Sequence, residues 1–243
     1  KTHFRICFRH KRQQQMITLE KLDIPQALLY MGHKGEPSDT LLKLVSDCEK
    51  LVLDAIKPSY VYREAVLIKN SENICIENSP LCLMGKDIAH HLENCDKAVI
   101  FAATLSSSAD SLIRRLEAED MSMALAADAL CSAAIEQVCG FAEEEIFSEL
   151  NCGFHTWRFS AGYGDLPLSL QKELTDYLNA QRRIGLTVTD NYLMIPRKSV
   201  TAIIGVSDNR IDTQPGGCAV CSMRDRCGIS KLGGCGFARK SKT

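Results

Sequence analysis

The stretch YVYREAVLIKNSENICIE, residues 60–77, decides the fold class. Its two apolar parts, 60–68 and 73–77, are rich in β-branched, aromatic and aliphatic side chains, and the polar KNSEN segment joins them. This pattern predicts two consecutive strands around a turn. Strands that are not regularly separated by helices disfavour a doubly wound parallel sheet, in which helices connect neighbouring strands.

The rest of the chain adds further strands and several helices. An apolar run at 97–104 predicts a strand, and the alternating stretches at 186–195 and 199–207 predict two more. Helical spacing of apolar residues predicts helices over 38–56, 86–95, 108–120, 120–150 and 169–185, the last beginning at Ser169 as N-cap and ending at Gly185. Together these elements predict an α+β domain with a twisted, largely antiparallel sheet covered by helices.

Charge divides the sequence into three parts. The formal net charge is -1, but residues 1–15 carry five Lys or Arg and no acid, and residues 216–243 carry six Lys or Arg and one acid. Positions 16–215 therefore hold 18 basic and 29 acidic residues. We expect a leader or expression remnant over 1–15, one globular domain over 16–215 and a tail over 216–243. The acidic body argues against a nucleic-acid surface, since phosphate contacts need clustered cations.

Hydropathy and cysteine usage indicate the cellular environment. The sequence has no uninterrupted run of about 18 apolar residues, as a membrane helix needs, and no signal-peptide pattern. Eight of the twelve cysteines, such as Cys48, Cys131 and Cys139, are scattered through apolar patterns as small core residues. We therefore expect a cytoplasmic protein without a membrane partner, in which these thiols stay buried and free.

The other four cysteines lie close together in the tail. They are Cys218, Cys221, Cys227 and Cys235, in a glycine-rich segment with few large apolar residues. Four thiolates that begin with a Cys-x-x-Cys pair can bind zinc or hold an iron–sulfur cluster, and a metal would order a segment that cannot bury a core. A disordered tail or a redox-active dithiol remains the alternative.

The stretch WRFSAGYGDLPLSLQ, residues 157–171, carries the strongest indication of a binding site. It predicts an extended approach, a bend around Tyr163 and a helix that opens after a proline. Arg158 presents a bidentate fork that suits a carboxylate, and Tyr163 offers a flat face for a purine. Glycines at 162 and 164 let a ligand approach the backbone. From these residues alone, a ligand site and a plain turn both remain open.

Three stretches in this order give the sequence a family resemblance. QALLYMGHKGEPSD (26–39), RFSAGYGDLPLSLQKEL (158–174) and LMIPRKSVTAIIGVS (193–207) together resemble the activation, or reactivation, domain of vitamin B12-dependent methionine synthase, in a stand-alone form. The resemblance spans about residues 17–215 and implies a mixed fold with a twisted antiparallel sheet and an S-adenosylmethionine site.

The resemblance also implies roles for particular residues. Arg158 would hold the ligand carboxylate, and Gly162 and Tyr163 would form the wall of the adenosyl site. Glu136, on the long helix, is a candidate for the ligand ammonium, and Ser199 shapes the second segment together with Met194 and Pro196. The S-adenosylmethionine site implied in this way consists of Glu136, Arg158, Ala161, Gly162, Tyr163 and Ser199.

The implied activity is a reductive methylation that needs partner proteins. In the family an electron and the methyl group of S-adenosylmethionine restore methylcobalamin from inactive cob(II)alamin, a transfer that depends on alignment more than on acid or base catalysis. No Asp-x-His-x-x-Gly cobalamin motif occurs in the sequence, so the corrin is expected on a partner, with flavodoxin or ferredoxin as the electron donor. No residue is assigned as catalytic, and His90 and His91 are expected to be solvated helix residues.

Other functions stay open from the sequence. The chain could activate another corrinoid methyl-transfer protein, or serve as a non-catalytic interaction module whose basic tail is ordered by metal. A self-sufficient methyltransferase is disfavoured, because no glycine-rich strand-to-helix loop with a following acidic ribose ligand is present.

Overall fold

The computed structural model of the chain describes residues 14–70 and 73–211. The strands are β1 (Gln14–Met16), β2 (Ser59–Lys69), β3 (Asn73–Ile76), β4 (Cys82–Met84), β5 (Lys97–Thr104), β6 (Phe154–His155), β7 (Thr187–Val188), β8 (Met194–Ile195) and β9 (Ser199–Ser207). The helices are α1 (Ile24–Tyr30), α2 (Asp39–Ala55), α3 (Lys86–His91), α4 (Ser107–Glu119), α5 (Met121–Leu150), α6 (Leu170–Leu178) and α7 (Ala180–Ile184).

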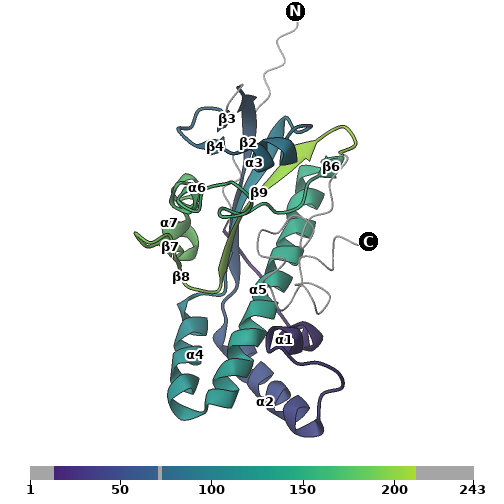
Figure 1. The fold of residues 1–243 in the computed structure, drawn as a ribbon, viewed down its shortest axis with the longest axis vertical. Helices are drawn as coiled ribbons and strands as arrows, with labels where there is room; N and C mark the ends of the chain where they lie inside the picture. Colours follow the sequence, from purple (N-terminus) through teal and green to yellow (C-terminus); the bar gives the residue numbers. More distant parts are fainter. Residues whose placement is uncertain (1–13, 71–72, 212–243) are drawn as a thin grey trace, which may run out of the picture.

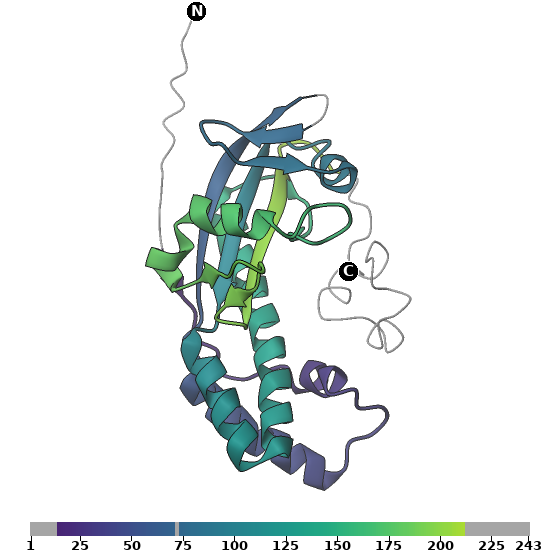
Figure 2. The same cartoon turned by 60° about the vertical axis from the view of Figure 1, so that its left-hand side comes forward.

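Seven of the described strands form one antiparallel sheet. Their order is β4-β3-β2-β5-β9-β6, and β1 pairs with β2. The long strands β2, β5 and β9 run side by side at its centre (Figure 2), with Ile100 of β5 opposite Arg63 on one neighbour and Ile203 on the other. The predicted α+β fold with an antiparallel sheet covered by helices is confirmed. The sheet also includes Gln14 and Gln15, which the charge pattern had placed in the leader.

The central strand β5 separates two hydrophobic cores. Val99 and Phe101 face a core built with α1, α2, α4 and α5, whereas Ala98 and Ile100 face a second core built with α3, α6 and α7. Successive side chains of a strand point to opposite faces, so a strand covered on both sides must be apolar throughout. This requirement explains why residues 98–103 of this strand are an unbroken apolar run rather than an alternating one.

The long helix α5 connects the helical part of the molecule to the sheet (Figure 1). Its N-cap is Asp120, whose side chain accepts hydrogen bonds from the backbone amides of Ser122 and Met123. The helix is long and apolar enough to cross a membrane by composition alone, but 67% of that window is buried in the domain. Its alanines lie against α1, α2 and α4, so α5 is the core helix of this layer.

Two predicted elements differ from the structure. The single helix expected over 169–185 is broken into α6 and α7, because Asn179 adopts a left-handed conformation with φ of 53°. Ser169 forms no side-chain cap, although Gly185 does end α7 with positive φ. The single strand expected over 186–195 is instead the short hairpin of β7 and β8, which forms its own two-stranded sheet.

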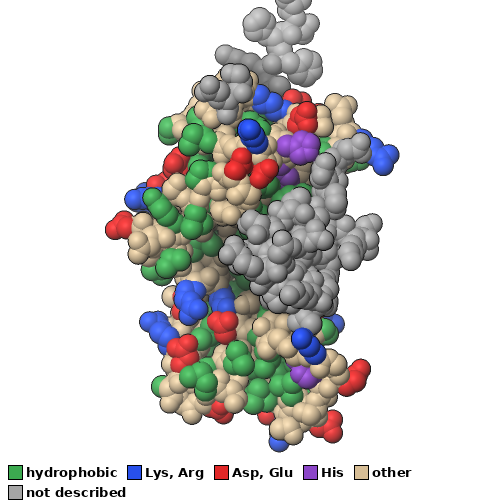
Figure 3. Space-filling model, in the orientation of Figure 1, with side chains coloured by type: hydrophobic (Ala, Val, Ile, Leu, Met, Phe, Trp, Pro, Cys, Tyr) green, Lys and Arg blue, Asp and Glu red, His purple; other side chains and the backbone are tan. Residues whose placement is uncertain are grey.

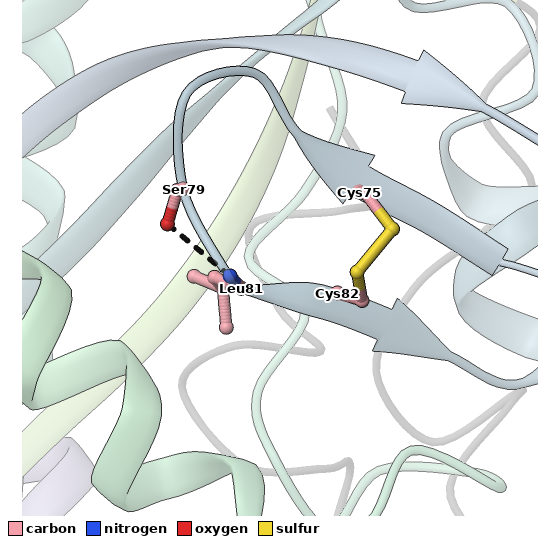
Figure 4. Close-up of a disulfide and its surroundings, with 4 residues drawn as sticks. All are labelled: Cys75, Ser79, Leu81 and Cys82. Atoms are coloured by element: carbon pink, nitrogen blue, oxygen red, sulfur yellow. Dashed lines mark hydrogen bonds between the residues drawn. A yellow bond between two sulfur atoms is a disulfide. The ribbon is translucent and has the colours of Figure 1, made fainter.

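The cysteine prediction was right for some residues and wrong for two. Cys48, Cys131 and Cys139 are free and buried, as expected. Cys75 and Cys82, however, form a disulfide across the β3–β4 hairpin (Figure 4), where they lie directly opposite one another. Both were expected to be free core thiols, but they are half-buried, and antiparallel pairing brings their side chains to the same face.

The surface charge is mixed on the face shown in Figure 3, where acidic and basic side chains are interspersed with apolar ones. The excess of acidic residues counted over 16–215 is therefore not gathered into one patch on this face.

Candidate functional site

A cavity of about 270 Å³ lies between α5, the segment that precedes α6, and the start of β9. Five of the six residues predicted for the S-adenosylmethionine site line it, although they come from distant parts of the sequence. The lining residues are Glu136, Arg158, Ser160, Ala161, Tyr163, Leu168, Gln171, Met194, Ser199, Val200 and Thr201.

Backbone pairing with β9 places the Arg158 segment at this cavity. The amide of Thr156 donates to the carbonyl of Gly205 at 2.9 Å, and Phe159 exchanges backbone hydrogen bonds with Ile203 at 2.9 and 2.8 Å. The segment thus runs as an extended edge along β9, as predicted, and side chains alternate between its two faces.

The predicted bend follows this edge directly. Gly162 has φ of 86°, a conformation that favours glycine, and its amide donates to the carbonyl of Leu166 at 3.0 Å. Gly162 does not itself line the cavity. A Cβ atom at this position would come within 3.2 Å of the side chain of Leu168, which does line it. The glycine therefore turns the chain and lets Leu168 close the wall.

Three charged side chains meet at the buried end of the cavity. Arg158, of which only 6% is exposed, donates from Nη2 to Glu136 at 2.9 Å and from Nε to Glu143 at 2.8 Å. Burial alone would lower the pKa of the guanidinium, but the negative charges around it, of Cys139 once its thiol is ionised and of the two carboxylates, raise it above the ordinary value. Burial raises the pKa of the Cys139 thiol to about 12, which keeps this neighbour neutral at physiological pH. Two carboxylates and one guanidinium give the cluster a net charge of -1.

Glu143 was missed by the sequence reasoning, although a signal for it exists. A buried glutamate needs a partner, and Glu143 lies seven residues after Glu136 on α5, which is two turns along the same helix face. One arginine can bridge both carboxylates for this reason. Arg158 was expected to face a ligand carboxylate, and its guanidinium also holds these two acids in place.

Tyr163 is the aromatic residue among those that line the cavity, and it belongs to a cluster of rings beside it. Tyr163 is 44% exposed, and its ring centroid lies 6.5 Å from that of Trp157 and 6.0 Å from that of Phe159. His91 belongs to the same cluster, with centroid distances of 4.6 Å to Trp157 and 5.0 Å to Phe159. The prediction that His91 is a solvated helix residue was wrong, whereas His90 is exposed as expected.

Burial gives His91 unusual titration behaviour. It lowers the pKa of the imidazole from 6.5 to about 4, against the opposing effect of a hydrogen bond to the backbone of Trp157. The ring therefore stays neutral at physiological pH. Its Nε2 atom lies 2.7 Å from the hydroxyl of Thr156, which also accepts the amide of Gly205 at 2.8 Å. This chain of contacts ties α3 to the sheet beside the Arg158 segment.

A second cavity of about 470 Å³ adjoins the first. Glu136, Ser199 and Val200 line both cavities, so the two form neighbouring parts of one groove along α5. Lys198 lies at the wall of the second cavity, where its ammonium bonds the Asp128 carboxylate at 2.9 Å and the Ser132 hydroxyl at 2.8 Å. The combined volume falls within the roughly 300–1,000 Å³ of small-molecule pockets.

Ser199 holds the second predicted segment in place. Its hydroxyl lies 2.8 Å from the Thr104 hydroxyl and 2.7 Å from the carbonyl of Pro196. Ser199 is buried, so it anchors the turn before β9 to the end of β5. Met194 lines the cavity, and the Ile195–Pro196 peptide bond is cis.

The predicted metal ligands Cys218, Cys221, Cys227 and Cys235 lie outside the described residues. Among residues 14–70 and 73–211, no group of three or more His, Cys, Asp or Glu side chains is arranged to hold a metal ion.

Comparisons with known proteins agree with this architecture. The family model described as vitamin B12 dependent methionine synthase, activation domain, matches residues 77–210. The crystal structure of the MetH reactivation domain bound to AdoHcy matches with a TM-score of 0.52 at 15% sequence identity, over 96% of this chain and 89% of the other. A search of curated proteins finds no match. The matched residues include β5, β9 and every residue lining the first cavity, and the chain belongs to the family of vitamin B12-dependent methionine synthase activation domains.

Proposed function

We propose that the chain binds S-adenosylmethionine in the groove between α5 and the Arg158 segment and presents its methyl group to a cobalamin on a partner protein. The observation that carries this proposal is the Glu136–Arg158 ion pair in the wall of a cavity that Tyr163 also lines. A known relative, the MetH reactivation domain, has been crystallised with AdoHcy, the product of such a methyl transfer.

The charged cluster suits the amino-acid end of the ligand. An α-ammonium and an α-carboxylate carry opposite charges, and so do Glu136 and Arg158, which lie 2.9 Å apart. Glu136 would accept the ammonium and Arg158 would bond the carboxylate through its planar fork. The net charge of -1 also favours a ligand that carries a sulfonium in addition to its zwitterion.

The outer end suits the adenosyl group. Tyr163 and Leu168 would contact the purine, with Ala161 and Met194 completing an apolar wall. The cobalamin, once reduced by one electron, supplies the nucleophile that takes the methyl group from the sulfonium. The residues of this chain would bind and orient the sulfonium for in-line transfer and exclude water from it, tasks that need no acid or base.

We also propose that the protein acts in trans and in the cytoplasm, with a cobalamin-binding methionine synthase as partner and flavodoxin or ferredoxin as electron donor. The sequence supports the first point, because it contains no Asp-x-His-x-x-Gly motif with which to bind cobalamin itself. A titration of this protein with a purified cobalamin-binding domain tests this point. Formation of a complex between the two separate chains supports action in trans, and absence of a complex contradicts it.

The tail cysteines carry a separate proposal that rests on sequence alone. Cys218, Cys221, Cys227 and Cys235 would hold an iron–sulfur cluster or zinc. Metal analysis and visible absorption of anaerobically purified protein distinguish the two. Absence of stoichiometric metal from the full-length chain contradicts both.

Calorimetry with S-adenosylmethionine tests the site itself. Glu136→Gln keeps the size of the side chain but removes its charge, and we expect the dissociation constant to rise on the order of 10- to 100-fold, the effect of losing one charge-assisted hydrogen bond. Glu144→Gln makes the same change at an exposed position of the same helix and should bind like the wild type. Equal affinity in all three proteins would remove the charged cluster from the ligand site.

A further inference from the structure

Two aspartates tie the Tyr163 loop to the start of α3. The carboxylate of Asp165 accepts hydrogen bonds from the backbone amides of Lys86, at 2.6 Å, and Asp87, at 3.1 Å. In return, the carboxylate of Asp87 accepts the backbone amide of Asp165 at 3.2 Å. Each segment therefore binds the backbone of the other through its own side chain, although 78 residues separate the two aspartates. We call this arrangement the Asp87–Asp165 clasp.

Glycines on both sides allow the clasp to close. Gly85 has φ of 140° and Gly164 has φ of 53°, both in the region that favours glycine. A Cβ atom at Gly85 would collide with the Asp165 carboxylate, and a Cβ atom at Gly164 would collide with the Asp87 carboxylate. The backbones of the loop and the helix are therefore separated only by these two carboxylates.

The electrostatics of Asp165 agree with this geometry. The hydrogen bond from the Lys86 amide, aided by that from Asp87, holds the pKa of the Asp165 carboxyl below its ordinary value. The carboxylate therefore stays ionised, and able to accept both amides, across the physiological pH range.

The clasp holds the loop that carries Tyr163, the aromatic residue of the cavity. Tyr163 stands between Gly162 and Gly164, and its backbone closes a turn through bonds from its amide to Ser160 and from Leu166 to its carbonyl. These bonds shape the loop internally, whereas the clasp attaches the loop to α3. The Tyr163 ring then lies at the cavity mouth, close to Trp157 and Phe159.

We infer that Asp87 and Asp165 are positioning residues that set the place of the Tyr163 ring over the cavity and so control how tightly the adenosyl group is held. This inference rests on the proposed function, because it assigns a consequence of the clasp for S-adenosylmethionine. Neither aspartate lines the cavity, so both act through Tyr163.

Fluorescence and binding together test the inference on the full-length protein. Trp157 is the only tryptophan in the chain, and its ring lies 6.5 Å from that of Tyr163, so its emission and its quenching by acrylamide report the loop without any ligand. We expect Asp165→Ala to shift that emission and increase quenching. Asp165→Asn retains one acceptor oxygen and should restore part of the wild-type signal. Asp190→Ala, an exposed acid on the β7–β8 turn, is the matched control and should change nothing.

Binding of S-adenosylmethionine then distinguishes positioning from general stability. Asp165→Ala should weaken binding about tenfold, comparable with Tyr163→Ala, as expected for loss of one base-stacking contact. The double variant should bind no more weakly than either single variant, because both changes remove the same contact. Additive losses, or full affinity in Asp165→Ala, overturn the inference. If the wild type binds no S-adenosylmethionine, the proposed function fails, and unchanged Trp157 emission in Asp165→Ala still overturns the positioning role by itself.

Discussion

The two ends of the cavity are built in opposite ways. At the buried end, Arg158 joins Glu136 and Glu143 through side-chain ion pairs between α5 and the edge of the sheet. At the outer end, Tyr163 is half exposed on a glycine-rich loop that backbone hydrogen bonds and the Asp87–Asp165 clasp hold in place. Side-chain charges therefore order the buried end, whereas contacts to the backbone order the outer end.

The largest expected effect on the buried end comes from removing the guanidinium of Arg158. Arg158→Ala leaves two glutamates facing one another without their counter-ion, and removing one member of a buried ion pair costs about 3–5 kcal/mol. Because Glu136 and Glu143 keep exposed fractions of 29% and 24%, we expect a value toward the lower end, about 3 kcal/mol. Urea unfolding measures it.

Arg182→Ala, at an exposed position on α7, is the control for loss of an arginine and should cost less than about 0.5 kcal/mol. If the two variants unfold at the same urea concentration, the Arg158 cluster contributes little to stability.

A second prediction concerns the aromatic cluster and pH. The unfolded chain protonates His91 near 6.5, but the folded protein does so only near 4. Between these values the unfolded state binds more protons, so stability falls as the pH is lowered from 6.5 to 4, by up to about 3 kcal/mol at roughly 1.36 kcal/mol per pKa unit. Unfolding free energies measured at several pH values should show this slope.

His91→Gln cannot titrate and should have a flatter stability profile over the same interval. The difference between the two profiles isolates His91 from the carboxylates that also protonate in acid. Parallel profiles would show that the imidazole is solvated, as the sequence had suggested.

The third prediction, with the smallest expected effect, tests how closely the loop at the outer end packs against α3. Gly164→Ala places a Cβ atom against Asp87 at a positive φ, whereas Gly32→Ala has a positive φ of 77° but nothing within 4 Å. The left-handed conformation alone costs about 1–2 kcal/mol in each case. Thermal unfolding should show an additional loss of about 1 kcal/mol for Gly164→Ala, from the overpacking. Equal losses would mean that the loop moves freely away from α3.

Much of the fold could be predicted from the sequence, because some segments leave only one option. Residues 97–104 and 199–207 were predicted with the bounds that the structure has, the first from its apolar run and the second from its alternation. The break at Asn179 was missed, because a left-handed residue is set by packing around it rather than by the helical pattern that surrounds it. The Cys75–Cys82 pair was missed for a similar reason, since only the hairpin register brings the two sulfurs together.

The residues that line the cavity were predicted mainly through the family resemblance. Composition and spacing did not decide whether the Arg158 stretch is a plain turn or a ligand site. The family resemblance added Glu136 and Ser199, and the fold brings both to the same cavity. Glu143 could have been found from its helical spacing. The Asp87–Asp165 clasp could not, because its partners are 78 residues apart in the sequence and only the folded chain brings them together.

The disulfide of the β3–β4 hairpin has a practical consequence. β4 leads through Gly85 into α3, so Cys82 lies on the strand that precedes the helix of Asp87. Experiments on corrinoid reduction supply strong reductants, and such reagents also open half-exposed disulfides. An assay of the proposed activity that contains such a reductant should therefore contain the dithiol form, whereas protein kept in air should retain the disulfide. A variant with serine at Cys75 and Cys82 would have the same covalent structure under reducing and oxidising conditions.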